Sequence, residues 1–133
     1  MQDFRRETHS VSALTVHLVC VTKYRRKVLD DPALAWLQEH ARQLFEKMDC
    51  KLMACDGEAD HLHLLVEFPP KLSVSAMVNA FNGTSNRRLR QARPDIARRY
   101  WKGVLWSPSY FAASTGGATP ETVRKYVENQ RSE

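Results

Sequence analysis

The sequence predicts a single α+β domain whose strands and helices follow one another in the order β-α-β-β-α-β-α. Residues 59–68 alternate apolar and polar side chains, which is typical of a strand with one buried face. Residues 32–48 and 74–89 repeat apolar side chains at helical spacing. Residues 12–21 are apolar in both parities, which indicates a central strand covered on both faces. The first six elements match the ferredoxin-like order, an antiparallel sheet with helices on one face.

The first half of the chain begins with a polar segment, residues 1–10, which is expected to be a flexible arm. After the first strand and a basic connector, Asp30 or Asp31 can cap a helix that has Pro32 in its first turn. The first helix is therefore expected to begin at these residues.

A hairpin and a second helix are expected in the middle of the chain. Residues 51–56 form the first strand of the hairpin, Gly57 begins its turn, and residues 61–68 form the second strand. Ser73 can cap the following helix. Pro94 is expected to end or kink that helix.

The last part of the chain is predicted to hold one strand and one helix. The strand is expected near residues 109–113, and the glycine-containing segment 115–118 is expected to be a flexible joint. Thr119 can cap the final helix, which has Pro120 at its first position and is expected over residues 119–131.

The composition favours an ordinary soluble domain that binds an anionic partner. The chain has 133 residues, of which 43% are hydrophobic and 26% are charged, and its net charge is +5. This length fits one domain over residues 1–133, and the basic balance favours nucleic acid as the partner. No apolar run approaches a membrane span or a signal peptide. The three cysteines show no CxxC spacing, so reduced thiols and a cytoplasmic location are expected.

Two histidines share one face of the strand predicted at 61–68. Because side chains alternate along a strand, His61 and His63 point the same way, whereas the apolar residues between and after them point the other way. This spacing lets a strand offer two imidazole nitrogens to one metal ion. The pair therefore predicts a metal site.

Two carboxylates flank the histidine pair. Glu67 shares the histidine face but lies two positions beyond Leu65, and Asp60 is expected to face the opposite way. Both are interpreted as structural residues or as partners of the metal ligands, so neither is assigned as a general base.

The last predicted helix places Tyr126 and Gln130 four residues apart and therefore on one helix face. A glutamine oxygen is a suitable third ligand for a hard divalent ion, and a tyrosine one turn away can act as a nucleophile. Taken alone, the pair favours a packed tyrosine and a solvated glutamine, and it points to chemistry only beside the strand with two histidines.

Four segments resemble, in order, the motifs of one enzyme family. They are Lys23–Leu29, Asp60–Leu65, Trp106–Tyr110 and Lys125–Gln130. In the second segment, His61-Leu62-His63 fits the HUH motif, in which one bulky apolar residue separates two histidines. The chain resembles the TnpA-type tyrosine transposases, which are the small single-domain HUH endonucleases of the simplest bacterial and archaeal insertion sequences.

The resemblance implies an activity and a set of site residues. Such enzymes cut and rejoin single-stranded DNA at the ends of a mobile element, recognise hairpins in the strand, and need no nucleotide cofactor. It implies that Tyr126 is the nucleophile and forms a 5′-phosphotyrosine link. It implies that His61, His63 and Gln130 hold a divalent metal, Mg²⁺ or Mn²⁺. It also implies a homodimer whose active sites form in trans, with each tyrosine helix docked on the other subunit's histidines.

Basic residues gather in two segments that could contact DNA phosphates. They are Lys23, Arg25, Arg26 and Lys27 after the first strand, and Arg87, Arg88 and Arg90 in the second helix. Tyr24, Trp101 or Trp106 could stack on a base, although core packing is the expected role of the two tryptophans.

Other functions remain open at this stage. A non-catalytic, ferredoxin-like nucleic-acid-binding module explains the charge and the fold, but it leaves the histidine pair and the spacing of Tyr126 and Gln130 unexplained. An HUH nuclease of another branch is a second alternative, although replication initiators often carry two tyrosines in the last helix and this helix has one. A structural zinc site needs four ligands of suitable spacing, which the cysteines do not provide.

Overall fold

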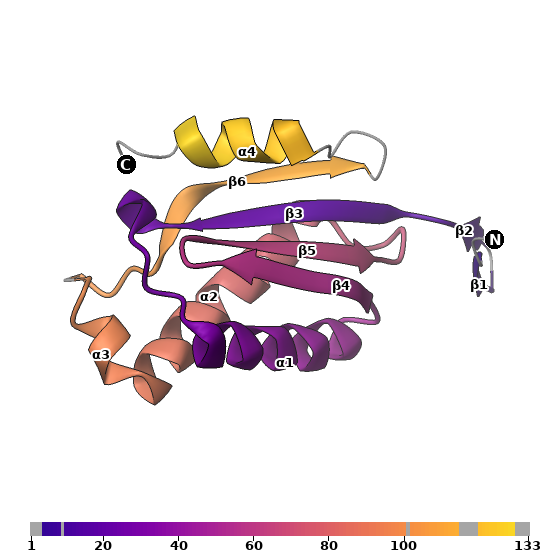
Figure 1. Ribbon diagram of the computed structural model, residues 1–133. Helices are drawn as coiled ribbons and strands as arrows, with labels where there is room; N and C mark the ends of the chain where they lie inside the picture. The colour runs from indigo at the N-terminus through magenta and orange to yellow at the C-terminus, as the bar shows by residue number, and fades with distance from the viewer. Residues whose placement is uncertain (1–3, 9, 101, 115–119, 130–133) are drawn as a thin grey trace.

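The computed structural model describes residues 4–8, 10–100, 102–114 and 120–129. The elements run along the chain as follows (Figure 1): β1 (Arg5–Glu7), β2 (Ser10–Ser12), β3 (Thr15–Thr22), the 3-10 helix η1 (Lys23–Arg25), α1 (Asp31–Lys47), β4 (Lys51–Glu58), β5 (His61–Glu67), α2 (Val74–Ala92), α3 (Pro94–Ala97), β6 (Trp106–Ser114) and α4 (Pro120–Asn129). The predicted α+β class is confirmed.

The main sheet has four strands in the order β4-β5-β3-β6. Every neighbouring pair is antiparallel, so the antiparallel sheet predicted from the sequence is confirmed. Helices α1 and α2 cover one face of this sheet, and α4 lies on the other face beside β6 (Figure 1). Strand β3 is central, and its apolar residues of both parities are buried, as its sequence predicts.

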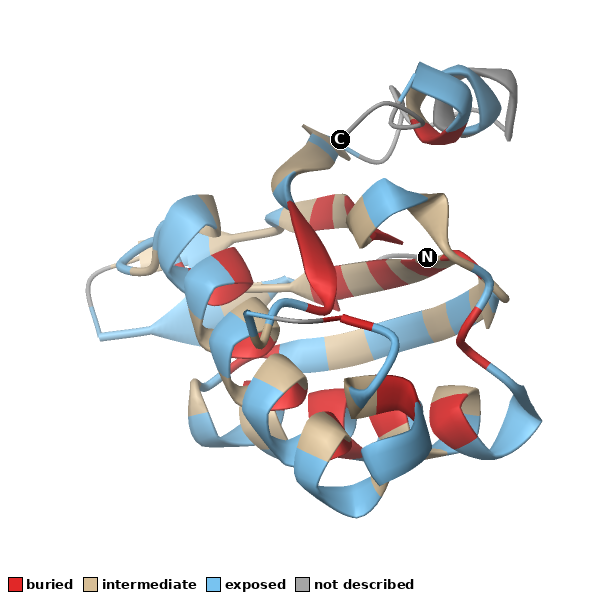
Figure 2. Cartoon of the chain, turned by 90° about the vertical axis from the view of Figure 1, so that its left-hand side faces the viewer, coloured by how far each residue is buried: buried red, intermediate tan, exposed pale blue. Residues whose placement is uncertain are grey.

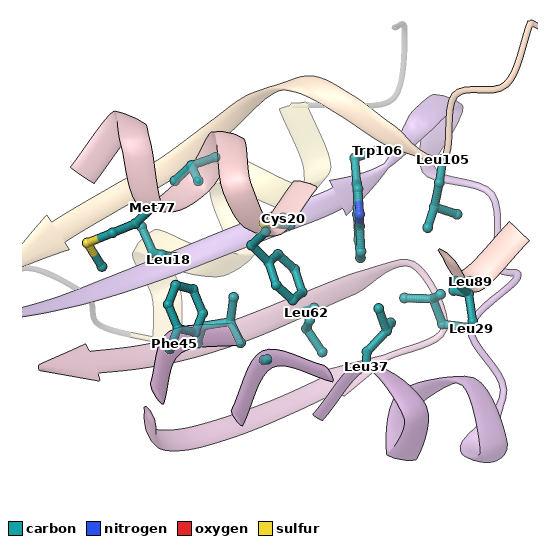
Figure 3. Close-up of a cluster of buried hydrophobic side chains, with 14 of the residues drawn as sticks. Leu18, Cys20, Leu29, Leu37, Phe45, Leu62, Met77, Leu89, Leu105 and Trp106 are labelled. Carbon is teal, nitrogen blue, oxygen red and sulfur yellow. The ribbon is translucent and has the colours of Figure 1, made fainter. Parts of the chain in front are cut away.

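The hydrophobic core lies between the sheet and helices α1 and α2. Leu18 and Leu62 of the sheet pack there with Phe45 of α1 and Met77 of α2 (Figure 3). Figure 2 shows that the buried residues of these two helices lie on the sides turned toward the sheet. Trp106 is also buried in this layer and donates its Nε1 hydrogen to Ser85 Oγ at 2.9 Å, so the core role expected for it is confirmed.

The helix starts follow the expected caps. Asp30 Oδ1 accepts from the Ala33 amide at 3.0 Å, and Ser73 Oγ accepts from the Ala76 amide at 3.1 Å. Each cap satisfies an amide that the first turn of a helix leaves without a partner. Thr119, the expected cap of the last helix, lies outside the described residues. None of the described helices is long and apolar enough to cross a membrane.

The N-terminal segment differs from the expected flexible arm. Its described residues include β1, which pairs with β2 in a two-stranded antiparallel sheet. Arg5 ties this sheet to the main one, because its Nε donates to Glu67 Oε2 at 2.8 Å and its Nη2 donates to Oε1 at 2.6 Å. This bidentate pair gives Glu67 a structural role.

Two strands are longer than the sequence indicates. Strand β4 continues through Gly57 to Glu58, so the hairpin turn lies at residues 59–60 and not at Gly57. Strand β6 begins at Trp106 and includes Pro108. Proline is tolerated there because β6 is an edge strand, with one side that needs no amide donor.

Gly57 lies where a side chain would collide with the neighbouring strand. A Cβ at this position would be 2.7 Å from the His61 carbonyl oxygen and 3.0 Å from Leu34 Cδ2. Because the main chain of β5 cannot yield as a flexible side chain does, we expect Gly57→Ala to lower the free energy of unfolding by roughly 1–3 kcal/mol. Urea denaturation measures this change.

Gly83 provides the matched control for that substitution. It lies in α2, where an added Cβ would meet nothing within 4 Å. Alanine is favoured over glycine inside a helix by about 1 kcal/mol, so Gly83→Ala is expected to be at least as stable as the parent protein. Equal stability of the Gly57→Ala protein and the parent would contradict the predicted collision.

Candidate active site

The histidine pair lies on the face of the sheet that is turned toward α4. Leu62 and Leu64 of β5 are buried in the main core, so the alternation of the strand directs His61 and His63 to the opposite face. The ring centroids of the two histidines are 5.2 Å apart. The predicted side-by-side arrangement of the two imidazoles therefore matches the structure.

The register of the sheet links this face to the last helix. On β3, Val21 is opposite His61 and Val19 is opposite His63. These two valines form a second, smaller cluster with Val127 of α4, which is separate from the main core. The histidines and α4 therefore share one side of the sheet.

A cavity of about 360 Å³ opens between the histidines and α4. Its walls come from η1, the β4–β5 hairpin and α4. The lining residues are Arg25, Glu58, Asp60, His61, His63, Arg124, Val127 and Glu128. Ionisable side chains make up most of this lining, so the cavity suits a charged or metal-bound ligand.

Asp60 lies at the centre of this cluster, where the sequence did not predict it. Its Oδ1 is 2.8 Å from His61 Nδ1, and its Oδ2 accepts from Arg25 Nε at 2.9 Å. The expectation that Asp60 faces away from the histidines was wrong, because Asp60 belongs to the hairpin turn and strand alternation does not apply there. Its interpretation as a partner of a metal ligand agrees with this geometry.

The cavity brings groups of the kind that bind divalent ions close together. Candidate donor atoms of Glu58, Asp60 and His61 all lie within 4.8 Å of one another, and the Asp60 oxygens of this group already contact His61 Nδ1 and Arg25 Nε. Burial lowers the pKa of His63, with His61 and His17 contributing through their charge, and this favours the neutral imidazole that a metal needs. Mixed imidazole and carboxylate donors suit Mn²⁺, and carboxylates suit Mg²⁺.

Glu58 is a candidate ligand that the sequence reasoning missed. The signal that could have identified Glu58 is the hairpin register, which sets Glu58 directly opposite His61. The sequence analysis placed the hairpin turn two residues too early, so it did not give this register. Gln130, the predicted third ligand, lies outside the described residues. Its assignment therefore stays a prediction.

Tyr126 of α4 lies against β6 and not among the residues that line the cavity. Its hydroxyl is 3.3 Å from Ser109 Oγ, and its ring centroid is 5.7 Å from that of Phe111. The rotation of α4 about its axis accounts for this position, because Val127 is the residue of α4 that packs on Val19 and Val21 of the sheet. Arg124 and Glu128, one turn apart, then face the cavity.

Several basic residues near η1 already have partners within the chain. Arg25 is paired with Asp60, and Arg26 donates to the Arg99 carbonyl. The Arg26 guanidinium also lies over two rings, 5.2 Å from the centroid of Tyr24 and 5.0 Å from that of Tyr100. On α2, Arg87 and Arg88 are exposed and Arg90 is half-buried, whereas Lys27 is exposed and Lys23 half-buried.

Of the two described aromatic residues expected to be able to stack on a base, Tyr24 is the exposed one, and the Lys23 ammonium and the Arg26 guanidinium lie over its ring. Its exposed fraction is 49%, whereas Trp106 is 4% exposed and Trp101 lies outside the described residues. The backbone of Tyr24 is left-handed, with φ of 60°, and so is that of Arg25, with φ of 53°. Such values are uncommon for residues other than glycine.

Comparison with known proteins identifies the relatives of this chain. The sequence model described as "Transposase IS200 like" matches residues 10–130. The ISDra2 transposase TnpA of Deinococcus radiodurans is 31% identical over 120 residues, which cover 90% of this chain and 86% of that protein. The transposase for insertion sequence element IS200 of Salmonella typhimurium is 27% identical over 133 residues, which cover 100% of this chain and 87% of that protein.

Solved structures agree with the sequence relatives. A crystal structure of a candidate transposase from Deinococcus radiodurans superposes with a TM-score of 0.89 at 31% identity, covering 97% of this chain and 99% of that one. A REP-associated tyrosine transposase bound to a REP hairpin shares the fold alone, with a TM-score of 0.58 at 14% identity, covering 96% and 69% of the two chains. The length of the family match, together with a relative above 30% identity, establishes that this chain belongs to the IS200-like transposases, a family of enzymes that act in DNA transposition.

Proposed function

We propose that this transposase cleaves and rejoins single-stranded DNA at the ends of an insertion sequence, with Tyr126 as the nucleophile. The observation that carries the proposal is that the His61 and His63 imidazoles face α4, the helix that bears Tyr126, across a cavity lined with charged side chains. A metal-binding pair and a tyrosine helix on one side of a sheet are the parts that this chemistry needs.

The proposed reaction is a reversible phosphodiester exchange. The Tyr126 oxygen attacks the phosphorus, the bond from phosphorus to the 3′ oxygen breaks, and the phenolic proton is lost while the departing 3′ oxygen gains one. The products are a 5′-phosphotyrosine link and a free 3′-OH. Because the link is itself a phosphodiester, another 3′-OH can reverse the step and join new ends without ATP.

A divalent ion fits the cavity, and His61 and His63 would hold it with an oxygen donor from Glu58 or Gln130. A tyrosine phenol has a pKa of about 10, so near neutral pH it is protonated and is a weak nucleophile. The phosphodiester that it attacks is an anion, which repels the negative charge that develops on the phenol oxygen. When bound, Mg²⁺ or Mn²⁺ supplies charge neutralisation at the scissile phosphate. Arg25 Nη1 is buried with no acceptor in the described part of the chain, and a phosphate oxygen in the cavity would satisfy it.

We infer further that the four-stranded part of the molecule is ferredoxin-like. The support is the element order β3-α1-β4-β5-α2-β6 together with the sheet order β4-β5-β3-β6. In this arrangement the first and third strands of the motif are the two central strands, which here are β3 and β5. That position holds the histidine strand between two neighbours and makes it rigid.

Tyr24 is proposed to stack on an unpaired base of the DNA. Its side chain is exposed within the basic segment at 23–27, and a stacked base contributes roughly 1–3 kcal/mol to binding. We therefore expect Tyr24→Ala to raise the Kd for single-stranded DNA about 5- to 150-fold. Fluorescence anisotropy measures the change.

Two controls separate stacking from a general loss of surface. Tyr24→Phe keeps a ring and is expected to bind as tightly as the parent protein. Phe4, whose exposed fraction is 59%, lies near the β1–β2 sheet, and Phe4→Ala is expected to leave the Kd unchanged. Equal weakening by Phe4→Ala and Tyr24→Ala would reject a specific role for Tyr24.

We propose that the active protein is a homodimer that binds DNA hairpins and forms its sites in trans. A fold neighbour is a tyrosine transposase bound to a hairpin, which supports the hairpin as ligand. The position of Tyr126 beside Ser109 supports a site completed by another subunit, because Tyr126 does not line the cavity of its own chain. The glycine pair at 116–117, expected to act as the joint, lies outside the described residues.

Mixed subunits test the trans arrangement. Neither His61→Ala nor Tyr126→Phe homodimers should cleave DNA, whereas a heterodimer of the two has one site with all its groups intact if the sites form in trans. We expect cleavage to return on mixing after the subunits have been dissociated and refolded together. If the mixture stays inactive although native mass spectrometry, which resolves the masses of the two variants, shows heterodimers, the sites form in cis.

The direct test of the proposed function uses the flanks of the protein's own gene as substrate. The purified protein is incubated with 5′- and 3′-labelled single-stranded DNA from these flanks, with Mg²⁺ or with EDTA. A covalent adduct on the 5′-phosphate side that needs the metal supports the proposal. Tight hairpin binding with no cleavage in either condition would instead identify a non-catalytic binding module.

A further inference from the structure

We infer that Arg25 is a positioning residue of the metal site, and that it acts on His61 through Asp60. The chain of contacts runs from the Arg25 guanidinium to Asp60 Oδ2 and from Asp60 Oδ1 to His61 Nδ1. The inferred result is that the His61 ring is held with Nε2 directed at the cavity. Its relevance to DNA cleavage rests on the proposed function, but the geometry itself does not.

The first step of the argument is the shelter of the ion pair. The exposed fraction of the side chain is 22% for Arg25 and 9% for Asp60. A carboxylate so little exposed needs a charged or hydrogen-bonded partner, because an unpaired buried charge is costly. Arg25 supplies that partner, and it therefore stabilises Asp60 as an ionised acceptor beside His61.

The second step is the tautomer of His61. Because the Asp60 carboxylate can only accept, the 2.8 Å contact from His61 Nδ1 to Oδ1 requires a hydrogen on Nδ1. In the neutral ring the lone pair then lies on Nε2, which is the nitrogen left to bind a metal. A carboxylate behind a histidine ligand also fixes the ring orientation and raises the basicity of the ligand nitrogen.

The third step is the backbone that delivers Arg25. Tyr24 and Arg25 are two successive non-glycine residues in the left-handed region, with φ of 60° and 53°. Such a conformation costs energy and persists where the surroundings enforce it, commonly at functional sites. Here the turn is held from both sides, since the Lys23 amide donates to the Leu105 carbonyl at 2.8 Å and Thr22 Oγ1 donates to the Arg26 carbonyl at 2.7 Å.

The same turn also holds the backbone of Asp60. The Thr22 amide donates to the Asp60 carbonyl at 3.0 Å, and Thr22 Oγ1 lies 3.2 Å from the same oxygen. Thr22 therefore holds the main chain of Asp60 by hydrogen bonds, and Arg25 holds its side chain. This double attachment accounts for a rigid carboxylate in a hairpin turn, where side chains are ordinarily mobile.

The competing role for Arg25 is a phosphate contact that has no effect on His61, and the two roles predict different measurements. If Arg25 only binds DNA, its removal lowers the DNA affinity and leaves the His61 ring unaltered. If Arg25 positions His61, its removal changes the His61 tautomer in the free protein, before any metal or DNA is added. The decisive readout is therefore the imidazole of the metal-free protein.

The test is ¹⁵N–¹H correlation NMR of the metal-free full-length protein at pH 8, where an ordinary imidazole is neutral. His61 signals are assigned by their loss in His61→Gln. The parent protein is expected to show the Nδ1–H tautomer. Arg25→Ala and Asp60→Asn are expected to shift His61 toward the Nε2–H form that prevails in free histidine, and Arg25→Lys is expected to be intermediate.

Mn²⁺ affinity is the second readout, measured by electron paramagnetic resonance without DNA. Loss of an outer partner of a metal ligand weakens binding roughly 10- to 100-fold, which is the loss expected for Arg25→Ala and Asp60→Asn. Arg42→Ala is the control, because Arg42 also pairs with carboxylates but lies exposed on α1. It is expected to change neither readout.

The outcomes separate this inference from the proposed function. An unchanged His61 tautomer and unchanged Mn²⁺ affinity in folded Arg25→Ala protein overturn the positioning role. If Arg25→Ala does not fold by circular dichroism, Arg25→Lys and Asp60→Asn decide the question by the same two readouts. Failure of the parent protein to cleave DNA would reject the proposed function but would leave both readouts in place.

Discussion

Substitution of Tyr126 by phenylalanine is expected to abolish the covalent protein–DNA adduct and to reduce cleavage by roughly 10⁴-fold or more, the scale on which removal of an enzyme nucleophile acts. Phenylalanine keeps the ring that packs near Phe111 and removes the hydroxyl alone. The fold and the affinity for hairpin DNA should therefore be retained. Denaturing gel electrophoresis with labelled single-stranded DNA and Mn²⁺ measures the adduct.

Tyr110 provides a matched control for this experiment. It lies on β6 opposite Cys20, which faces the main core, and it packs against that core. Tyr110→Phe removes a phenol from the same strand that Tyr126 contacts, but on the other side of the sheet. It is expected to form the adduct as the parent protein does. An adduct that persists in Tyr126→Phe and disappears in Tyr110→Phe would move the nucleophile to Tyr110.

Substitution of His63 by alanine is the change with the second-largest expected effect. Because outer partners of metal ligands alone contribute 10- to 100-fold, loss of a ligand itself should weaken Mn²⁺ binding by at least about 100-fold and reduce cleavage to the level seen in EDTA. Single-turnover cleavage over a range of Mn²⁺ concentrations distinguishes the two effects. A rate restored by high Mn²⁺ would indicate weaker binding, and a rate that stays low would indicate misplacement of the ion.

His17 is the control for this substitution. It lies on β3 opposite Leu65, on the same face as His63, but it is not among the residues that line the cavity. His17→Asn is therefore expected to keep metal-dependent cleavage. If His63→Ala cleaves DNA as the parent protein does, the histidine pair does not hold the catalytic metal.

The parts of the molecule that follow from local rules could be predicted from the sequence. Alternation along β5 predicts that His61 and His63 share a face, because Leu62 and Leu64 have to reach the core. Asp30 and Ser73 cap their helices because their short side chains can reach the free amides of a first turn. These rules depend only on neighbours in the chain.

The parts that depend on tertiary contacts could not be predicted. The direction of Asp60 depends on the position of the hairpin turn, and the turn lies beyond Gly57 because β4 continues to pair with β5. The left-handed backbone of Arg25 has no signal in a residue type that ordinarily avoids it. The rotation of α4, which directs Tyr126 toward β6, depends on the contact of Val127 with Val19 and Val21.

The separation of the two clusters by the sheet has a consequence for how such an enzyme can change. Val19, Val21 and Val127 hold α4 without sharing a buried side chain with the core beneath α1 and α2. Both clusters nevertheless contact β3, where Val19 and Val21 alternate with the core residues Leu18 and Cys20. Free energies add independently only for sites that are distant and share no partner. We therefore expect substitutions in α1 or α2 to combine nearly additively with substitutions in α4, and substitutions in β3 to affect both. A search for a more heat-resistant variant that keeps the contacts of α4 should begin in α1 and α2 and leave β3 unchanged.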